Sequence, residues 1–289
     1  MEEDVRLDSF AKINIGLKIV NKREDGFHNI ETIFYPIKLH DEIHISISPN
    51  ESQYNSVYIT CNKYYVPSNK DNICFKAIEA FFKNFHIKDC YKIAINIGKK
   101  IPVGGGLGGG SSDAAVVLKH LIRFFKIDIK ENRKKIMDTA LSIGSDVPFF
   151  LIMKPCFAEG RGEKLKILPE FNIPYDILIV NPQLHVSTKW AYENLNLEIG
   201  KNYPSDLKGV AKFNPDEKEI FSNDFERVVF EKYDSLRQIK ERLIEHGAVF
   251  ASMSGSGATM YAFFKKEDKK SLNKSYRYFK EKNYFVYIS

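Results

Sequence analysis

The sequence predicts a globular protein of mixed class, in which α-helices and β-strands alternate irregularly along the chain. Apolar residues that alternate with polar ones indicate strands, and apolar residues spaced three or four apart indicate helices. The composition, with 44% hydrophobic and 28% charged residues, is ordinary for a soluble globular protein. With 289 residues, the chain can bury a sizeable core in one large domain or in two of ordinary size.

The predicted elements are spread over both halves of the chain. Ile93, Ile95 and Ile97 alternate with polar or small residues and predict a half-buried strand. The apolar run 149–153, between Pro148 and Pro155, predicts a strand that closes the first half. In total, strands are expected at residues 13–19, 43–48, 92–97, 149–153, 175–180 and 260–264. Helices are expected at residues 73–84, 111–125 and 236–245.

A dense glycine run is the most informative local feature. Residues 102–112 read PVGGGLGGGSS, with six glycines in the seven positions from Gly104 to Gly110. In a helix or strand each glycine would cost roughly 0.5 to 1 kcal/mol relative to alanine, so bare backbone must be needed here. Consecutive N–H groups without Cβ atoms can converge on one anion. Ser111, Ser112 and Asp113 are favoured N-cap residues before a helical pattern, so the run predicts a phosphate loop at a helix N-terminus.

Several loop types fit a glycine run between a strand and a helix. A Walker A loop needs a lysine after its second glycine, and here Ser111 follows Gly110 directly, which excludes that type. A dinucleotide fingerprint, G-x-G-x-x-G, is formally present within residues 104–109. Asp128 lies near the distance of its acidic ribose partner, but no convincing second strand carries it. A flexible hinge is the remaining structural interpretation.

The loop is similar to the phosphate loop of the GHMP kinases, a family of small-molecule kinases without a Walker motif. The family pattern is a proline followed shortly by Gly-Leu-Gly-Ser-Ser and an alanine. The chain supplies it with Pro102, Gly106, Leu107, Gly108, Ser111, Ser112 and Ala114, and adds Gly109 and Gly110. Seven further motifs of the family occur in the same order as in the family, at residues 11–15, 23–28, 143–149, 160–163, 186–188 with Tyr192, 223–226 and 253–258. The resemblance therefore covers most of the chain.

This resemblance implies an α+β fold of two domains. Residues 1–160 would form an N-terminal domain like domain 2 of ribosomal protein S5, which carries the glycine-rich ATP loop. Residues 161–289 would form a ferredoxin-like C-terminal domain. The implied activity is phosphorylation of an alcohol by ATP, which is a co-substrate, with Mg²⁺ bridging the phosphates. No protein ligand of the magnesium ion can be named from the sequence.

The resemblance also implies the catalytic residues. Asp146, in the segment IGSDVPF, would be the base that acts on the substrate hydroxyl, and Lys12 would be the cation beside it. Asn14, on the same face of the strand as Lys12, would orient the hydroxyl or the aspartate. Taken alone, an aspartate after Gly-Ser is more often a turn or cap residue. A lysine in an alternating strand more often faces solvent.

The resemblance also implies that the substrate carries a cytidine group in addition to the reacting hydroxyl. Phe27 and Tyr192 lie at positions that resemble the family's stacking aromatics, and His28 at that of its cytosine-binding histidine. Many relatives have tyrosine where Phe27 stands, so stacking would survive here but a hydroxyl contact would not. Because the chain holds 22 Phe and 15 Tyr, a given aromatic residue is otherwise more often part of the core.

The predicted ATP site combines the glycine loop with flanking residues. Lys99 and Asn72 resemble adenine-side residues of the family. The segment Ser254-Gly255-Ser256-Gly257 is expected either to fold over the phosphates or to be a simple tight turn between two strands. The predicted ATP-binding residues are Asn72, Lys99, Pro102, Val103, Gly104, Gly105, Gly106, Leu107, Gly108, Gly109, Gly110, Ser111 and Ser112.

Bulk properties limit the partners and leave some alternatives open. The net charge of +6 suits anionic small molecules weakly, and the scattered basic residues do not indicate nucleic acid. Four widely spaced cysteines and an N-terminus without an apolar segment indicate a reduced, cytoplasmic protein without a membrane partner. The oligomeric state is left open. Alternatives are a GHMP kinase of the mevalonate or homoserine type, a GHMP-fold ligand sensor without turnover, and a dinucleotide oxidoreductase.

Overall fold

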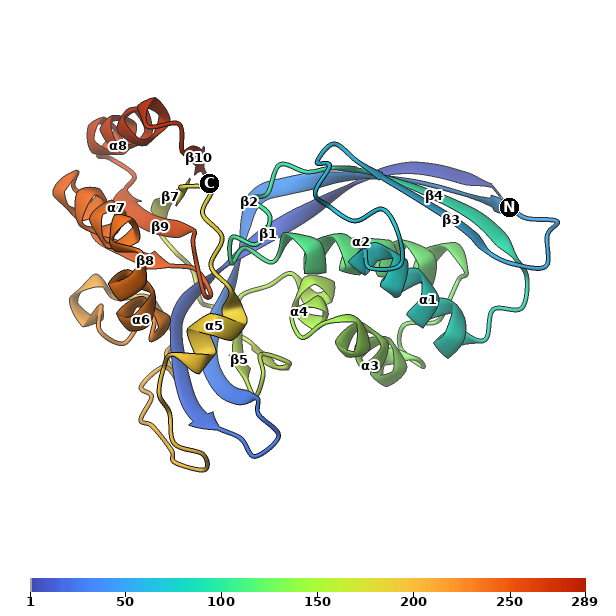
Figure 1. The fold of residues 1–289 in the computed structure, drawn as a ribbon, viewed down its shortest axis with the longest axis horizontal. Helices are drawn as coiled ribbons and strands as arrows, with labels where there is room; N and C mark the ends of the chain where they lie inside the picture. The colour runs from blue at the N-terminus through green and yellow to red at the C-terminus, as the bar shows by residue number, and fades with distance from the viewer. Residues whose placement is uncertain (1) are drawn as a thin grey trace. The chain divides into compact units, whose positions relative to one another are not determined.

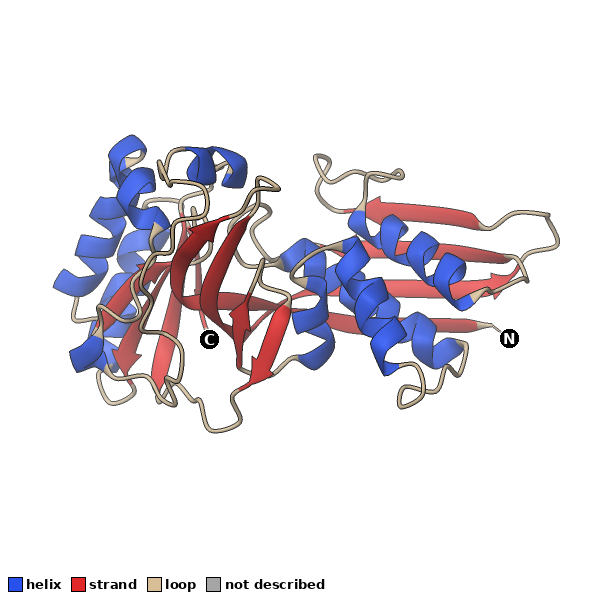
Figure 2. Cartoon of the chain, turned by 90° about the horizontal axis from the view of Figure 1, so that it is seen from below, coloured by secondary structure: helices blue, strands red, loops and turns tan. Residues whose placement is uncertain are grey.

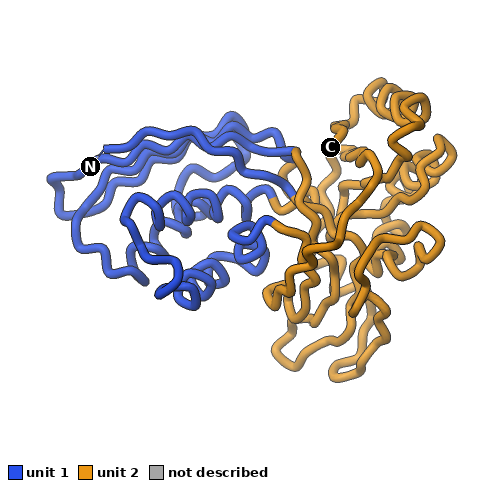
Figure 3. Tube along the Cα trace, turned by 180° about the vertical axis from the view of Figure 1, so that it is seen from behind, with its two compact units in different colours: residues 1–11, 39–101, 109–153 blue, residues 12–38, 102–108, 154–289 orange. Residues whose placement is uncertain are grey.

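The computed structural model describes residues 2–289, which divide into two compact units (Figure 3). Unit 1 contains the chain up to Ala11, Leu39–Ile101 and Gly109–Met153, and unit 2 contains Lys12–Lys38, Pro102–Gly108 and Lys154–Ser289. Both units are discontinuous in sequence, whereas the expected domains are consecutive segments; the boundary at residue 160 stays a prediction. None of the helices within residues 2–289 is long and apolar enough to cross a membrane.

Two long strands pass through both units, β1 (Glu3–Lys22) and β2 (His28–Pro49), and pair with each other. In unit 1, β2 pairs antiparallel with β4 (Tyr91–Gly98), which pairs parallel with β3 (Ser56–Cys61). Four helices cover one face of these strands (Figures 1 and 2). They are α1 (Ile73–Phe85), α2 (Gly109–Phe124), α3 (Arg133–Ile143) and α4 (Val147–Ile152). Because α1 connects the parallel strands β3 and β4, this part of the chain is a β–α–β crossover.

The predicted strand at residues 149–153 is wrong, because these residues belong mainly to α4. Pro148 lies in the first turn of this helix, where its missing N–H costs no hydrogen bond. Met153 ends the helix in the left-handed conformation, with φ 52° and its N–H bonded to the Phe149 carbonyl oxygen. A short apolar run gives no usable periodicity, so the sequence did not separate a buried helix from a buried strand.

The start of α2 also differs from the expectation. The helix begins at Gly109, so Ser111, Ser112 and Asp113 are its third to fifth residues and not its caps. The first four N–H groups of an α-helix have no acceptor within the helix. In α2, which begins at Gly109, they are the groups of the preceding Gly108 and of Gly109, Gly110 and Ser111, all four of which are predicted ATP-binding residues.

Unit 2 contains a four-stranded antiparallel sheet in the order β10-β7-β9-β8. The strands are β7 (Tyr175–Asn181), β8 (Phe250–Met253), β9 (Met260–Lys265) and β10 (Phe285–Ile288). The helices are α5 (Thr188–Glu193), α6 (Phe225–Lys232), α7 (Asp234–Glu245) and α8 (Lys269–Glu281), with a 3-10 turn at Pro215–Glu217. This β–α–β–β–α–β order is that of a ferredoxin-like fold, as the resemblance implies.

The remaining strands of unit 2 extend the first half of β2. There β2 pairs with β5 (Cys156–Glu159) through Thr32–Phe34, and β5 pairs with β6 (Lys164–Ile167). An apolar core cluster joins the inner face of the four-stranded sheet to α6–α8 and to β1 at Leu17 and Ile19. The other predicted strands and helices are confirmed, with ends that differ by a few residues except in β1 and β2, which are much longer than expected.

Candidate active site

Lys12 is buried in β1 and does not face solvent. The residue is 4% exposed, and its Nζ atom donates a hydrogen bond to Asn14 Oδ1 over 2.6 Å. It also lies 4.8 Å from the centre of the Phe34 ring, a cation–π distance. Asn14 Nδ2 in turn donates to Thr32 Oγ1 over 3.1 Å. The predicted pair of residues two positions apart is therefore a buried, oriented ammonium–carboxamide pair.

The first part of the glycine loop, residues 102–108, lies in unit 2 against the turn after β8. A Cβ atom added to Gly106, whose φ is +77°, would overlap the Ser254 carbonyl oxygen. A Cβ atom on Gly105 would lie 2.7 Å from Thr259 Oγ1 and 2.8 Å from Asn181 Nδ2. Glycine is required here by close backbone approach as well as by backbone conformation.

Backbone contacts join this loop to β1. The Lys12 N–H donates to the Leu107 carbonyl oxygen over 3.0 Å. The Ser254 hydroxyl donates to the Gly106 carbonyl oxygen over 2.9 Å and accepts the Asn14 N–H over 3.2 Å. The turn at Ser254–Gly257 is thus both a tight turn, closed by the Gly257 N–H on the Ser254 carbonyl oxygen, and a support of the glycine loop.

Asp146 lies in unit 1, at the turn between α3 and α4. It occupies the N-cap position of α4, but its side chain does not cap that helix, so the cap interpretation of this aspartate is wrong. A Cβ atom added to Gly144 would lie 3.4 Å from Val147, 3.8 Å from Ile73 and 3.9 Å from Ser111 Oγ. The turn that carries Asp146 therefore packs beside the N-terminus of α2.

Lys99 and Asn72 have structural partners in unit 1. Lys99 is 6% exposed and forms ion pairs with Asp41 and, over 2.8 Å, with Asp113. Asp41 Oδ1 also accepts the N–H groups of residues 100 and 101. Asn72 caps α1, accepting the Cys74 N–H over 2.8 Å. The Lys99 side chain holds the polypeptide beside the loop and the Asn72 side chain holds the start of α1, and their contact with adenine stays a prediction.

The ion pairs of Lys99 define a buried triad of Asp41, Lys99 and Asp113 that links β2, the end of β4 and α2. Burial lowers the pKa of Lys99, but the Asp113 and Asp41 carboxylates more than offset this effect and raise that pKa. Burial raises the pKa of Asp113 to about 6; Lys99 opposes this shift and Asp41 adds to it. The triad therefore holds the two stretches of unit 1 that flank the glycine loop, one before residue 102 and one after residue 108.

The predicted cytidine-binding residues are grouped in unit 2. His28 begins β2 after the tight turn at residues 23–27, and its ring stacks on Tyr192 with 4.5 Å between centres and 18° between planes. The His28 Nε2 atom is buried without a hydrogen-bond partner among the described residues. Burial, and then the nearby Lys22, lower the pKa of His28. A neutral imidazole with an unused nitrogen suits the edge of a base.

Phe27 differs from its neighbours in its exposure. It is 48% exposed, and the Arg161 guanidinium lies 3.9 Å from its ring centre. Tyr192 packs edge-on against Phe225 at 4.8 Å. The structure thus brings His28 and Tyr192 together, while Phe27 stacks with an arginine.

Some residues of this site were missed from the sequence. Asp41 and Asp113 had no recognised role as partners of Lys99, and Asn181 and Thr259 were not connected with the glycine loop. Long-range contacts such as these leave no local pattern. The sequence signal available was that the motifs at residues 223–226 and 253–258 match motifs of the family in the same order, which marks these segments but not their contacts.

Comparison with known proteins matches both halves of the chain. The family model described as the GHMP kinases N terminal domain matches residues 72–154, and the one described as GHMP kinases C terminal matches residues 207–279. A 4-diphosphocytidyl-2-C-methyl-D-erythritol kinase of Chlorobium phaeobacteroides is 36% identical, covering 96% of this chain and 95% of its own. The enzyme of the same name from Bacteroides thetaiotaomicron is 40% identical, with 89% and 91% covered.

A solved structure gives the same result. The crystal structure of a 4-(cytidine 5'-diphospho)-2C-methyl-D-erythritol kinase superimposes with a TM-score of 0.75 and 25% identity, over 98% of each chain. The two-domain fold expected from the sequence is confirmed. The chain therefore belongs to the GHMP kinases, in the family of the 4-diphosphocytidyl-2-C-methyl-D-erythritol kinases.

Proposed function

We infer that the chain transfers the γ-phosphoryl group of ATP to the 2-hydroxyl of 4-diphosphocytidyl-2-C-methyl-D-erythritol and releases ADP, a step of the non-mevalonate isoprenoid precursor pathway. The observation that carries this inference is similarity along nearly the whole chain to kinases of that name, reaching 36% identity over 96% of it. The buried Lys12, the supported glycine loop and the His28–Tyr192 stack are the parts that such a reaction needs.

The glycine loop is the proposed site of the ATP phosphates. Its N–H groups, with those of the first turn of α2, can converge on phosphate oxygens, and the positive end of the helix favours the negative charge. The Ser111 hydroxyl adds a donor at the same helix terminus. A γ-phosphoryl group held in this way is positioned for in-line attack, which is most of what phosphoryl transfer requires.

Asp146 and Lys12 are the proposed catalytic pair. The 2-hydroxyl oxygen attacks the γ-phosphorus, the bond from that phosphorus to the bridging oxygen breaks, and ADP leaves. Asp146 accepts the hydroxyl proton, and the Lys12 ammonium stabilises the negative charge on the attacking oxygen. Asn14 holds the Lys12 ammonium over 2.6 Å and so fixes its direction.

His28 and Tyr192 are proposed to bind the cytosine. One ring of the stacked pair would offer an aromatic face, and the unpartnered His28 Nε2 a hydrogen bond to the base edge. Phe27, with half of its surface exposed, supplies a second aromatic surface at the turn before β2. These contacts would separate this substrate from mevalonate or homoserine, which carry no base.

Mg²⁺ is proposed to arrive with ATP. Among residues 2–289 no group of three His, Cys, Asp or Glu side chains has the geometry of a metal site. An ion that arrives with ATP would be held mainly by phosphate oxygens and water, the usual arrangement for this ion in kinases. The ion would neutralise charge on the transferring phosphoryl group.

A substrate panel tests the proposed function. The purified chain is incubated with ATP and Mg²⁺ and with either 4-diphosphocytidyl-2-C-methyl-D-erythritol, mevalonate or homoserine, and ADP release is followed. ADP release should require the cytidylyl substrate. Release with mevalonate or homoserine alone would assign the chain to another small-alcohol kinase. No release with any of the three, despite saturable ATP binding, would favour a ligand sensor.

A further inference from the structure

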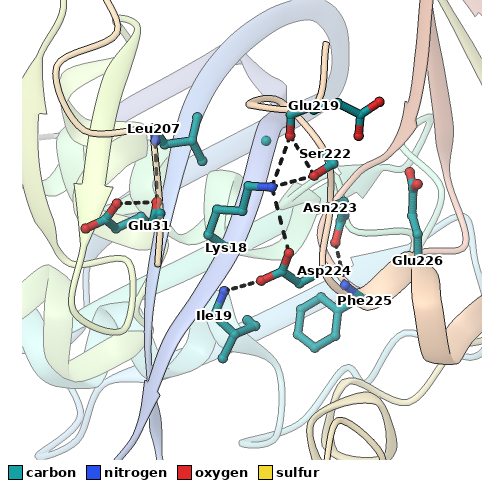
Figure 4. A network of polar contacts seen from close by, with 12 residues as sticks. Lys18, Ile19, Glu31, Leu207, Glu219, Ser222, Asn223, Asp224, Phe225 and Glu226 are labelled. Atoms are coloured by element: carbon teal, nitrogen blue, oxygen red, sulfur yellow. Dashed lines mark hydrogen bonds and ion pairs between the residues drawn. The ribbon is translucent and has the colours of Figure 1, made fainter. Parts of the chain in front are cut away.

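The motif NDFE at residues 223–226 has no part in the proposed reaction, and it lies beside β1 at Lys18 and Ile19 (Figure 4). The Leu17 N–H of β1 donates to the Ser222 carbonyl oxygen over 3.0 Å, and the Asp224 N–H donates to the Leu17 carbonyl oxygen over 2.9 Å. The Asp224 carboxylate accepts the Ile19 N–H over 2.8 Å. The segment is therefore fixed on β1, a few residues after Asn14.

Asn223 uses its whole carboxamide in this arrangement. Its Nδ2 donates to the Met253 carbonyl oxygen over 2.7 Å and to the Gly255 carbonyl oxygen over 2.8 Å. Its Oδ1 accepts the Phe225 N–H over 3.0 Å at the start of α6. The residue is 4% exposed. Both amide hydrogens and the oxygen are therefore paired, a combination that only a carboxamide can supply.

The two carbonyl groups held by Asn223 lie on either side of Ser254. That residue is fully buried, and its hydroxyl joins the Gly106 carbonyl oxygen to the Asn14 N–H. Further along the same turn, Ser256 Oγ lies 2.7 Å from Thr188 Oγ1 at the start of α5. The turn thus contacts the glycine loop, the strand of Lys12 and the helix of Tyr192, all within unit 2.

We propose that Asn223 is a positioning residue for the phosphate loop. By holding the carbonyl groups of Met253 and Gly255 it sets the Ser254 hydroxyl against Gly106, and so fixes the loop conformation in which the backbone N–H groups meet ATP. The inference rests on the proposed function, because it assumes that the glycine loop binds ATP. The hydrogen bonds of Asn223 go to the turn and to the start of α6, so it acts on the loop through the turn.

Asn223→Asp isolates this role. A carboxylate keeps the oxygen that accepts the Phe225 N–H, but it cannot donate, and it repels both carbonyl oxygens. We expect the Kd for ATP, measured by calorimetry with Mg²⁺ present, to rise about tenfold or more. Asn214→Asp is the matched control, because it makes the same chemical change at a residue whose oxygen caps the 3-10 turn at Pro215–Glu217. The control should stay within about twofold of the wild-type Kd.

A double-mutant cycle separates positioning from general stability. Ser254→Ala removes the hydroxyl through which Asn223 is proposed to act, so it should also weaken ATP binding. The double variant Asn223→Asp with Ser254→Ala should be no more than about twofold weaker than the weaker single variant. Melting temperatures and circular dichroism of all variants check folding. If Asn223→Asp does not fold, Asn223→Ser, which keeps an acceptor and one donor, takes its place with the same expectations.

The outcomes distinguish this proposal from the proposed function. A folded Asn223→Asp variant with wild-type affinity for ATP, or effects of Asn223 and Ser254 that multiply, would overturn the positioning role. A wild-type chain that binds ATP but does not phosphorylate the cytidylyl substrate would overturn the proposed function alone. The double-mutant cycle measures the Kd for ATP and does not depend on turnover. A wild-type chain that does not bind ATP would overturn both.

Discussion

Asp146 lies at the N-cap position of α4, but its side chain makes no capping hydrogen bond to that helix. The turn that carries it packs against the start of α2. A base must present its carboxylate to the substrate, and a carboxylate tied to helix N–H groups would be a weaker one. The geometry of unit 1 is thus compatible with the proposed role, and the pairing of Asp146 with Lys12 stays a prediction.

Replacing this carboxylate tests the role directly. Asp146→Asn should lower kcat by about 10² to 10⁴, the usual range for a lost general base, and should leave the Kd for ATP nearly unchanged. Asp138→Asn is a suitable control, because Asp138 is an exposed residue of α3 that pairs with Lys134 over 3.1 Å. Near-normal turnover of Asp146→Asn would remove Asp146 from the base role.

The ring of Tyr192 is expected to serve the substrate more than the fold. Tyr192→Ala should raise KM for the cytidylyl substrate by an amount equivalent to about 1 to 3 kcal/mol of lost stacking, with KM for ATP little changed. Tyr192→Phe keeps the ring and should stay close to the wild type. Steady-state kinetics give KM for both substrates in each variant. An unaltered KM for the cytidylyl substrate in Tyr192→Ala would mean that another group holds the cytosine.

The buried triad predicts a pH dependence of stability. The pKa of Asp113 is raised by burial from 3.8 to about 6, so the folded chain binds this proton more tightly than the unfolded chain does. The stability gained is present at low pH and is lost as the pH rises through about 6. Asp113→Asn keeps an acceptor for Lys99 without the charge beside Asp41. Its melting temperature, relative to that of the wild type, should therefore rise between pH 5 and pH 7.5; parallel curves would contradict the assignment.

Among the elements, the glycine loop shows most clearly how close packing limits sequence. A Cβ atom at Gly106 would meet backbone, the Ser254 carbonyl, which cannot move aside as a flexible side chain can. Gly200 has nearly the same φ, +76° against +77°, but open space around it. Comparison of the two positions separates steric exclusion from backbone strain.

Alanine at each position makes that comparison. Gly106→Ala should weaken ATP binding at least tenfold, because the loop and the Ser254 turn must separate, whereas Gly200→Ala carries only the strain of a positive φ, about 1 kcal/mol. Calorimetric titration with ATP and thermal melting measure both effects. Equal decreases in melting temperature in the two variants would show that backbone conformation alone, and not contact with the turn, requires glycine at position 106.

Elements with a clear period were predictable from the sequence, and those without one were not. The alternation of Ile93, Ile95 and Ile97 identified β4, and the pattern after the glycines identified α2. The run 149–153 had no period long enough to separate strand from helix, and Pro148 was interpreted as a boundary when it is a first-turn residue. Caps were also misplaced, since Ser111 has cap chemistry but lies inside α2.

At the scale of the whole molecule, the order of the motifs identified the fold and the family, but not the contacts. The ferredoxin-like order of unit 2 and the kinase family are confirmed. That β1 and β2 each contribute to both units was not foreseen, because strand length and pairing depend on partners far away in sequence. The ion pairs of Lys99 and the hydrogen bonds of Asn223 were missed for the same reason.

The central claim concerns the product, so the most direct measurement identifies it. The chain is incubated with ATP, Mg²⁺ and 4-diphosphocytidyl-2-C-methyl-D-erythritol, and the mixture is followed by phosphorus NMR. One new phosphomonoester at the 2-position should form for each ADP, while the diphosphate signals of the substrate remain. Formation of ADP with inorganic phosphate and no new ester, or no ADP at all, would contradict the account.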